Sequence, residues 1–261
     1  MRIQESDLFG KLDAPTSFNQ LLSMILEPPK PKGNNVWMWR GHASIDWRID
    51  SSAYRRLKTK TAKPTDRDIE WYEKSLIKRA KHRGYNFFDG HDLSDFDVLA
   101  RLQHHGAATR LLDATRSALV GLFFACSTEP QKTGILLGFH SFTLGGYEGE
   151  PKPESYDDVV QGLAKFSHAV TWQPPDVSPR IAAQHSQFLY SAVSDNAMGS
   201  LRFEKEREDF LAIPIFPSIK EKSLTILRES FDIRDLTLFP DLDGFARSNA
   251  SDQHPYSYAR W

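Results

Sequence analysis

The sequence predicts an α+β fold in a single domain, with helices concentrated in the first half around a mixed or split β-sheet. Segments with apolar residues at helical spacing dominate the first half, and strand-like apolar runs lie mostly later. This order differs from the strict strand–helix alternation of a parallel doubly wound sheet. No change in composition divides the 261 residues, so we expect one domain over residues 1–261.

The predicted helices have recognisable beginnings and ends. Residues 16–26 place five apolar side chains on one face, with Thr16 or Ser17 as the N-cap. Residues 65–83 begin at the cap Thr65 and end at a glycine, and residues 94–104 begin at Ser94. Further helices are expected after Asp113, within 157–167 and at 218–231, with a short one capped by Asp241.

The predicted strands are short apolar runs. They are VWMWR (36–40), GILLGFHSF (134–142), HSQFLYSA (185–192) and FLAIPIF (210–216). Residues 48–57 are expected to be extended or to form a short turn. The single cysteine, Cys126, falls in an apolar helical run and is expected to be buried.

Composition restricts the class of protein. The net charge of −1 indicates neither nucleic acid nor a membrane as a partner. Residues 30–83 nevertheless hold 15 Lys and Arg against 6 Asp and Glu, which suits a solvated helix face or a polyanion-binding surface. Because no apolar stretch reaches about 18 residues and no signal core is present, we expect a cytoplasmic protein without a membrane span.

Arg40 ends a strand-like segment rich in tryptophan. Alternation along this strand places Trp37 and Trp39 on one face and Met38 and Arg40 on the other. The tryptophans, with Trp47, are expected in the core, where one of them can line a pocket. An arginine in such a place needs an anionic partner, since burying it unpaired is costly. That partner is either Asp113 or an external anion.

A second polar group lies between two predicted helices, in QHHGAATRLLDAT (103–115). His104, Thr109, Arg110 and Asp113 are concentrated at one turn. A local structural explanation is available, in which Asp113 caps the next helix and Arg110 pairs with it. The alternative is an anion-binding turn at a helix N-terminus.

These motifs resemble the FRG domain family, whose signature is Phe or Tyr followed by Arg-Gly. WRGH (39–42) is similar to that signature, and 103–115 and ALVGLFFA (118–125) are similar to the segment that follows it. RIAAQHSQF (180–188) and LFPDLDGFA (238–246) resemble later family segments, so the motif-bearing core is about 36–246. Ala108 and Ala114 stand where the family usually has Pro and Trp.

The resemblance implies an ADP-ribosyltransferase-like toxin or anti-phage effector that uses NAD as its substrate. The basic region 30–83 favours nucleic acid as the acceptor, with RNA preferred, and protein is the alternative. A toxin is also expected to have an antitoxin or chaperone as a partner. The residues implied in NAD binding are Arg40, Gly41, His104, Thr109, Arg110 and Asp113, where Gly41 lets the ligand approach the backbone. The implied catalytic residues are Arg40, His104, Gln184, Gln187 and Glu208, the last from an E-x-E run that also suits a solvated turn.

Two other functions remain open. One is a non-enzymatic module that binds a ligand or nucleic acid, or senses phage. The other is a nuclease with His104 as its base. No metal is expected, because adjacent histidines cannot share one ion from a regular helix and residues 239–244 lack the remaining ligands of a calcium loop.

Overall fold

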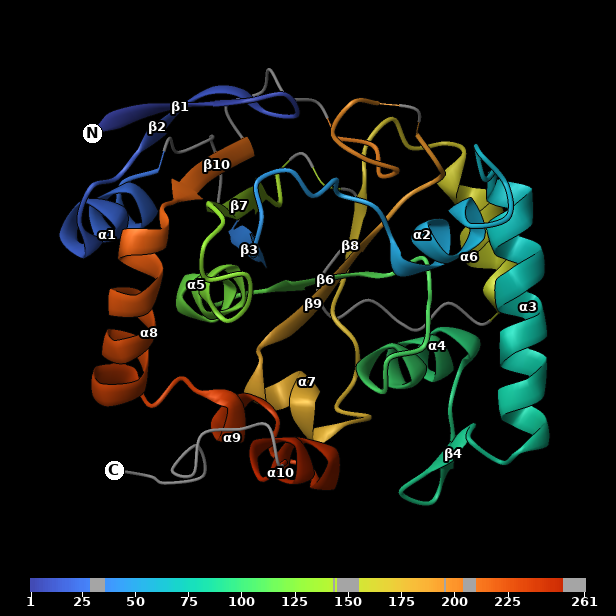
Figure 1. The fold of residues 1–261 in the computed structure, drawn as a ribbon. Helices are drawn as coiled ribbons and strands as arrows, with labels where there is room; N and C mark the ends of the chain where they lie inside the picture. The colour runs from blue at the N-terminus through green and yellow to red at the C-terminus, as the bar shows by residue number, and fades with distance from the viewer. Residues whose placement is uncertain (29–35, 143, 145–154, 195, 204–209, 251–261) are drawn as a thin grey trace.

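The computed structural model describes residues 1–28, 36–142, 144, 155–194, 196–203 and 210–250 (Figure 1). Within these residues, six strands form one antiparallel sheet in the order β10-β7-β3-β6-β9-β8. They are β3 (Trp37–His42), β6 (Leu112–Thr115), β7 (Gly134–His140), β8 (Val170–Trp172), β9 (Ser186–Tyr190) and β10 (Phe210–Ile215). Two hairpins pair β1 (Arg2–Ser6) with β2 (Gly10–Ala14), and β4 (Phe87–Phe88) with β5 (His91–Asp92). The α+β class is confirmed.

The two halves of this sheet meet at a single point. β3 pairs with β7 along its whole length, from Trp37↔His140 to His42↔Ile135. In the part of the chain that the structure describes, β3 and β6 pair only through Trp39↔Thr115. Figure 1 shows β6 and β9 crossing the centre of the molecule while β3, β7 and β10 lie together at the upper left. The sheet is therefore split between β3 and β6, immediately beside Arg40.

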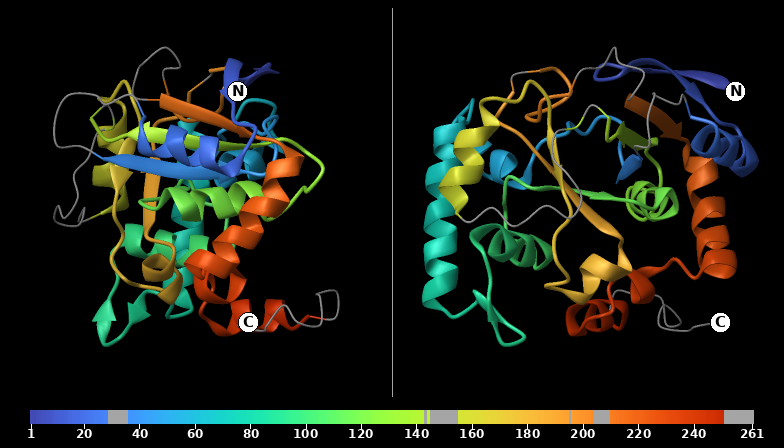
Figure 2. Two further views of the ribbon diagram at one scale, coloured as in Figure 1. Left: turned by 90° about the vertical axis from the view of Figure 1, so that its left-hand side faces the viewer. Right: turned by 180° about the vertical axis from the view of Figure 1, so that it is seen from behind.

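One hydrophobic cluster covers the β3 half of the sheet. It is formed by α1 (Phe18–Leu26), α5 (Ala118–Cys126) and α8 (Pro217–Phe231), which surround the buried Trp39, Leu122, Leu136 and Leu227. Figure 2 shows α5 lying across the strands and α8 descending beside it. The tryptophan predicted as core at position 39 is 4% exposed, and Cys126 is buried as predicted.

A second cluster covers the β8–β9 half. It joins α3 (Asp66–His82), α4 (Asp95–His104) and α6 (Tyr156–Leu163) around Phe96 and Phe188. α2 (Ser52–Lys58) packs on α3 through Tyr54 and Ile69. α7 (Pro179–Ala183), α9 (Asp235–Leu238) and α10 (Leu242–Ser248) gather beyond the end of β9 that faces away from the hairpin β1–β2 (Figure 1).

Several predicted helix boundaries are confirmed by their caps. Ser17 caps α1, and Thr65 and Ser94 cap α3 and α4 with capping boxes. Gly106 has a φ of 85° just beyond α4, a conformation that favours glycine. Asp241 caps α10 by accepting from the Gly244 amide.

Other local predictions are wrong. Residues 48–57 are not extended as a whole: α2 begins at Ser52, because burying Tyr54 against α3 favours a helix. Asp113 does not cap the following helix. It lies within β6, opposite Phe188, and Ser117 caps α5 instead. The short helices α7 and α9 were not predicted, since they carry too few residues for a clear periodicity. Every described helix is too short or too polar to cross a lipid bilayer.

Candidate functional site

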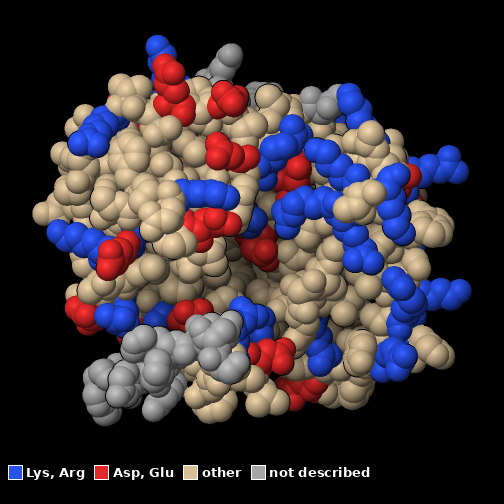
Figure 3. All heavy atoms as spheres, viewed as in Figure 1, with Lys and Arg blue, Asp and Glu red and all other residues tan. Residues whose placement is uncertain are grey.

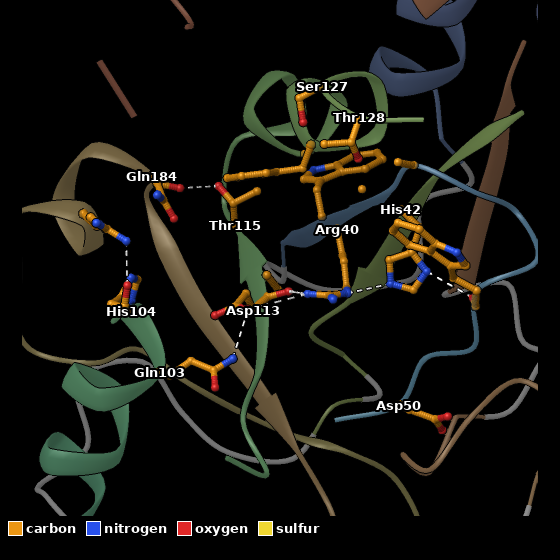
Figure 4. Close-up of a pocket in the computed structure, with 18 of the residues that line it drawn as sticks. Arg40, His42, Asp50, Gln103, His104, Asp113, Thr115, Ser127, Thr128 and Gln184 are labelled. Carbon is orange, nitrogen blue, oxygen red and sulfur yellow. Dashed lines mark hydrogen bonds and ion pairs between the residues drawn. The ribbon is translucent and has the colours of Figure 1, made fainter. Parts of the chain in front are cut away.

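A cleft opens where β3 and β6 separate. Its volume is about 770 Å³, which suits a ligand of nucleotide size. β3 and β6 form its floor, and the ends of α4, α5 and α7 contribute its walls (Figure 4). Of the residues predicted for the site, it contains Arg40, Gly41, His104, Asp113 and Gln184.

Arg40 projects from β3 into this cleft, and its side chain is 17% exposed. Its Nε donates to His42 Nε2 at 2.8 Å, and Nη1 donates to the Asp113 carbonyl at 2.5 Å (Figure 4). Nη2 has no acceptor among the residues that the structure describes. Burial lowers the pKa of Arg40 to about 10 although Asp113 opposes this shift. The guanidinium therefore stays charged at neutral pH, with one edge available to an anion.

His42 accepts a hydrogen bond from the Arg40 guanidinium and so fixes its orientation. It follows Arg40 by two residues, so strand alternation places both side chains on one face. Because Nε2 accepts from Arg40, the ring proton is on Nδ1, which lies 3.2 Å from the Trp47 carbonyl oxygen. Burial, reinforced by the charge of Arg40, lowers the pKa of His42 to about 3. His42 is thus a neutral partner for a cation. The sequence analysis missed it, although its spacing from Arg40 was a usable signal.

Asp113 approaches Arg40 from β6. Its Oδ2 lies 3.9 Å from Arg40 Nη1 and accepts from Gln103 Nε2 at 3.1 Å. Gln103 is itself oriented by Thr109, whose hydroxyl donates to its Oε1 at 2.8 Å. Thr109 is fully buried and does not line the cleft. Gln103, which was not predicted, is therefore the residue of this turn that reaches the site, and Thr109 supports it.

His104 lies at the end of α4 and lines the opposite wall of the cleft. Its ring packs edge-on against Phe188, and its Nε2 is buried without a partner among the described residues. Burial lowers the pKa of His104, and the nearby Asp113 offsets part of the shift. The imidazole is neutral at physiological pH.

Arg110 does not reach the cleft or Asp113. Its Nε donates to Glu73 Oε2 at 2.6 Å, its backbone amide donates to the same carboxylate, and Nη2 donates to the Tyr156 hydroxyl at 2.8 Å. All three side chains are buried. The Glu73 carboxylate raises the pKa of Arg110 against the effect of burial. The side chain points toward α3 because it finds its carboxylate there, so this arginine joins α3 and α6 to the sheet.

The two predicted glutamines are placed differently. Gln184 ends α7 at the cleft, where its Nε2 donates to the Leu238 carbonyl at 2.9 Å. Gln187 is 1% exposed on β9 and donates to the Thr171 hydroxyl, so it does not line the cleft. Glu208 lies outside the described residues.

An ion pair fastens the wall formed by α7 and α10. Arg180 donates to Asp241 through Nε at 2.5 Å and Nη2 at 2.8 Å, and through Nη1 to the His104 carbonyl at 2.6 Å. The hydrogen bonds from Arg180 lower the pKa of Asp241, although burial opposes them. The segments 180–188 and 238–246 thus meet at this pair, which fixes the cleft wall.

Gly41 has a packing role that does not require a ligand. A Cβ at this position would lie 2.1 Å from the Gly121 oxygen and 2.3 Å from the Ala125 nitrogen. The glycine therefore lets the backbone of α5 lie directly on β3, and this contact explains it better than close approach of a ligand.

Aromatic side chains and further arginines complete the cleft. Trp47, Phe124 and Phe239 line it, and Trp47 is 44% exposed, contrary to its predicted place in the core. Arg48 and Arg55 lie at the same opening. Flat apolar rings beside guanidinium groups suit a ligand that combines aromatic rings with phosphate.

Thiol and metal chemistry have little support among the described residues. Burial raises the pKa of Cys126 to about 12, so its thiol stays protonated. No group of three or more His, Cys, Asp or Glu side chains in the described ranges could hold a metal ion.

The model of a protein family described as FRG domain matches residues 35–134. This segment supplies Arg40, His42, Gln103, His104 and Asp113, the polar centre of the cleft. Neither a curated protein nor a solved structure matches the chain.

Proposed function

We propose that the cleft, whose polar centre comes from the residues 35–134 that match the FRG domain model, binds NAD and that the protein transfers ADP-ribose from it. The proposal rests on how closely three arginines, Arg40, Arg110 and Arg180, approach a carboxylate. Arg110 and Arg180 each lie within 2.6 Å of a carboxylate oxygen. The nearest carboxylate oxygen to Arg40 among the described residues is 3.9 Å away. Arg40 alone of the three keeps a largely uncompensated charge, and it faces the cleft.

The diphosphate of NAD suits this arginine. A guanidinium offers a planar fork that matches two phosphate oxygens, and partial burial strengthens the attraction by excluding water. The Asp113 carboxylate, held by Gln103, offers an acceptor for ribose hydroxyls. Trp47, Phe124 and Phe239 supply surfaces for the nicotinamide and adenine rings.

The reaction breaks the bond between the ribose and the nicotinamide nitrogen. The electron pair of that bond passes to the ring nitrogen, so nicotinamide leaves as a neutral molecule. The positively charged ribose carbon is then captured by a nucleophile of the acceptor, which loses its proton to solvent. A carboxylate or an oriented dipole near the ribose stabilises the developing charge. Asp113, whose side chain is 55% exposed, is the carboxylate that lies beside Arg40.

The test uses NAD labelled in its adenosine half. Binding of NAD, release of nicotinamide and transfer of label to RNA, DNA and total protein are measured for the wild type and for Arg40→Ala. Arg228→Ala serves as the control, because Arg228 pairs with Glu229 in exposed positions on α8. We expect Arg40→Ala to lose at least ten-fold in NAD affinity, a typical loss for a charge-assisted contact, while Arg228→Ala retains it. A folded wild type that neither binds nor cleaves NAD would refute the proposal.

We further propose that the activity is toxic to the producing cell, as a toxin or an anti-phage effector, with an antitoxin or chaperone as its partner. Expression should then arrest growth, and Arg40→Ala should relieve the arrest. If Arg40→Ala arrested growth as the wild type does, the toxicity would not depend on the cleft.

A ligand-binding module without turnover is the second candidate. It is favoured by the engagement of the cleft carboxylate of Asp50, which pairs with Arg48 at 3.3 Å and is therefore not free to stabilise charge on a ribose. NAD binding without release of nicotinamide would support it. A nuclease with His104 as base is less well supported, because the Nε2 of His104 is buried although the residue lines the cleft.

A further inference from the structure

The surface next to the cleft is strongly basic. We define the α2–α3 basic surface as Arg55, Arg56, Lys58, Lys60, Arg79 and Arg83, all of which are exposed. Figure 3 shows Lys and Arg atoms gathered to the right of a central hollow, over the place of α2 and α3 in Figure 1. This concentration contrasts with the net charge of −1 for the whole chain.

The acidic side chains of the same region are engaged in other contacts, so they do not neutralise this surface. Glu73 is buried against Arg110, and Asp66 accepts from the Val193 amide. Asp68 belongs to the capping box of α3, and Glu70 pairs with Lys74. Among the described residues, no carboxylate lies within 4 Å of a cationic group of Arg56, Lys58, Lys60 or Arg83. Their charges are therefore available to a partner.

The basic surface is continuous with the cleft. Arg55 is the first exposed cation of α2, and it also lines the cleft. The Arg56 guanidinium lies over the Tyr72 ring, 5.6 Å from its centroid, and so links α2 to α3. Arg56 and Arg79 both act electrostatically on the Tyr72 hydroxyl. A row of cations thus leads from the cleft across α2 to α3.

We infer that this surface binds the phosphate backbone of a single-stranded nucleic acid and delivers one of its nucleotides to the cleft. The inference rests on the proposed function, for which it names the acceptor. Phosphates match the row of cations, and a cleft of about 770 Å³ accommodates individual nucleotides rather than a duplex. Trp47 at its opening is 44% exposed and offers a ring on which an unpaired base can stack.

The test measures binding in the absence of NAD. Fluorescence anisotropy is recorded with labelled 20-nucleotide single-stranded RNA, single-stranded DNA and duplex DNA over a range of NaCl concentrations. The test variant is Arg56→Gln/Lys58→Gln/Lys60→Gln. The matched control, Lys11→Gln/Lys132→Gln/Lys222→Gln, removes the same charge from exposed positions elsewhere.

The wild type is expected to bind both single strands more tightly than the duplex. The test variant should lose at least ten-fold in affinity, and its slope of log affinity against log salt should fall by about 2, since each phosphate contact on a single strand contributes about 0.7. The control should stay within about two-fold of the wild type. A preference between RNA and DNA identifies the acceptor.

Three outcomes would overturn the inference: no binding of either single strand at 50 mM NaCl, duplex bound as tightly as single strand, or equal losses in both triple variants. Arg40→Ala separates this inference from the proposed function. It should bind nucleic acid like the wild type while losing NAD. A wild type that binds single strands but not NAD would refute the proposed function and leave the surface established.

Discussion

The protonation of His42 should make the stability of the protein depend on pH. The imidazole is buried, accepts a hydrogen bond from Arg40 and has its pKa lowered to about 3. In the unfolded chain its pKa returns to about 6.5. The unfolded state therefore binds a proton at a pH where the folded state does not, and stability falls as pH drops below about 6.5, continuing to about pH 3.

The size of the effect follows from these two pKa values. At pH 5 the unfolded imidazole is almost fully protonated, and the folded one is almost fully neutral. The free energy of unfolding should then be lower by about 2 kcal/mol at pH 5 than at pH 7.5 through this residue alone. Other groups also titrate in this interval, so the contribution has to be isolated with a variant.

His42→Gln is that variant. The glutamine oxygen can accept from Arg40, its amide can donate to the Trp47 carbonyl, and the side chain does not titrate. Urea denaturation is followed at pH 7.5 and pH 5 for both proteins. The wild type should lose about 2 kcal/mol more than His42→Gln between the two pH values. Equal losses would show that His42 does not stay neutral against the Arg40 guanidinium, and the interpretation of the cleft as a positive site would fail.

Three other predictions concern packing and burial. Gly41→Ala should destabilise the protein by several kcal/mol, because its Cβ would lie 2.1 Å from the Gly121 oxygen, and a melting temperature within about 2 °C of the wild type would contradict the packing role. Glu73→Ala should reduce the free energy of unfolding by about 3–5 kcal/mol, since it leaves the Arg110 guanidinium buried without its carboxylate, and a loss below about 1 kcal/mol in urea denaturation would refute this role. Cys126, with a pKa of about 12, should resist iodoacetamide at pH 8 in the folded protein and react in urea, and mass spectrometry showing rapid modification of the native protein would contradict its burial.

Features specified by local sequence were predictable. Ser17, Thr65 and Ser94 each precede an amphipathic segment, and each caps the helix that follows. The alternation of VWMWR placed Trp37 beside Trp39, and their ring centroids are 5.9 Å apart. These signals act within one turn or one strand, so they depend little on the rest of the fold.

Features specified by distant partners were not predictable. Arg110 is adjacent in sequence to polar residues of the cleft, yet its carboxylate is on Glu73, 37 residues earlier. Asp113 precedes a helix and resembles a cap, but pairing with β9 places it in a strand. Both errors arise because a single sequence does not show which segments become neighbours in the tertiary structure.

Of the residues that line the cleft, the sequence analysis named Arg40 and missed those that support it. Arg40 was singled out because a charged group ends an apolar strand, and it lies in the cleft with Asp113. His42 and Gln103 were missed, although each is hydrogen-bonded to one of these two residues. The unused signal was the presence of polar side chains near these charges: His42 two residues along the strand from Arg40, and Gln103 ten residues before Asp113 at the end of α4.

The hydrogen bond between Arg40 and the neutral His42 stabilises the buried guanidinium without cancelling its positive charge. A buried arginine is usually stabilised by a carboxylate, as Arg180 is by Asp241, but that pairing cancels the charge. A neutral imidazole accepts the Nε hydrogen bond and fixes the direction of the guanidinium while adding no negative charge. The remaining cost of desolvation lowers the pKa of Arg40, and the proposed anion would relieve it. A carboxylate in place of His42 would stabilise the folded state and cancel the charge of Arg40, so the neutral histidine is the partner that the proposed anion binding requires.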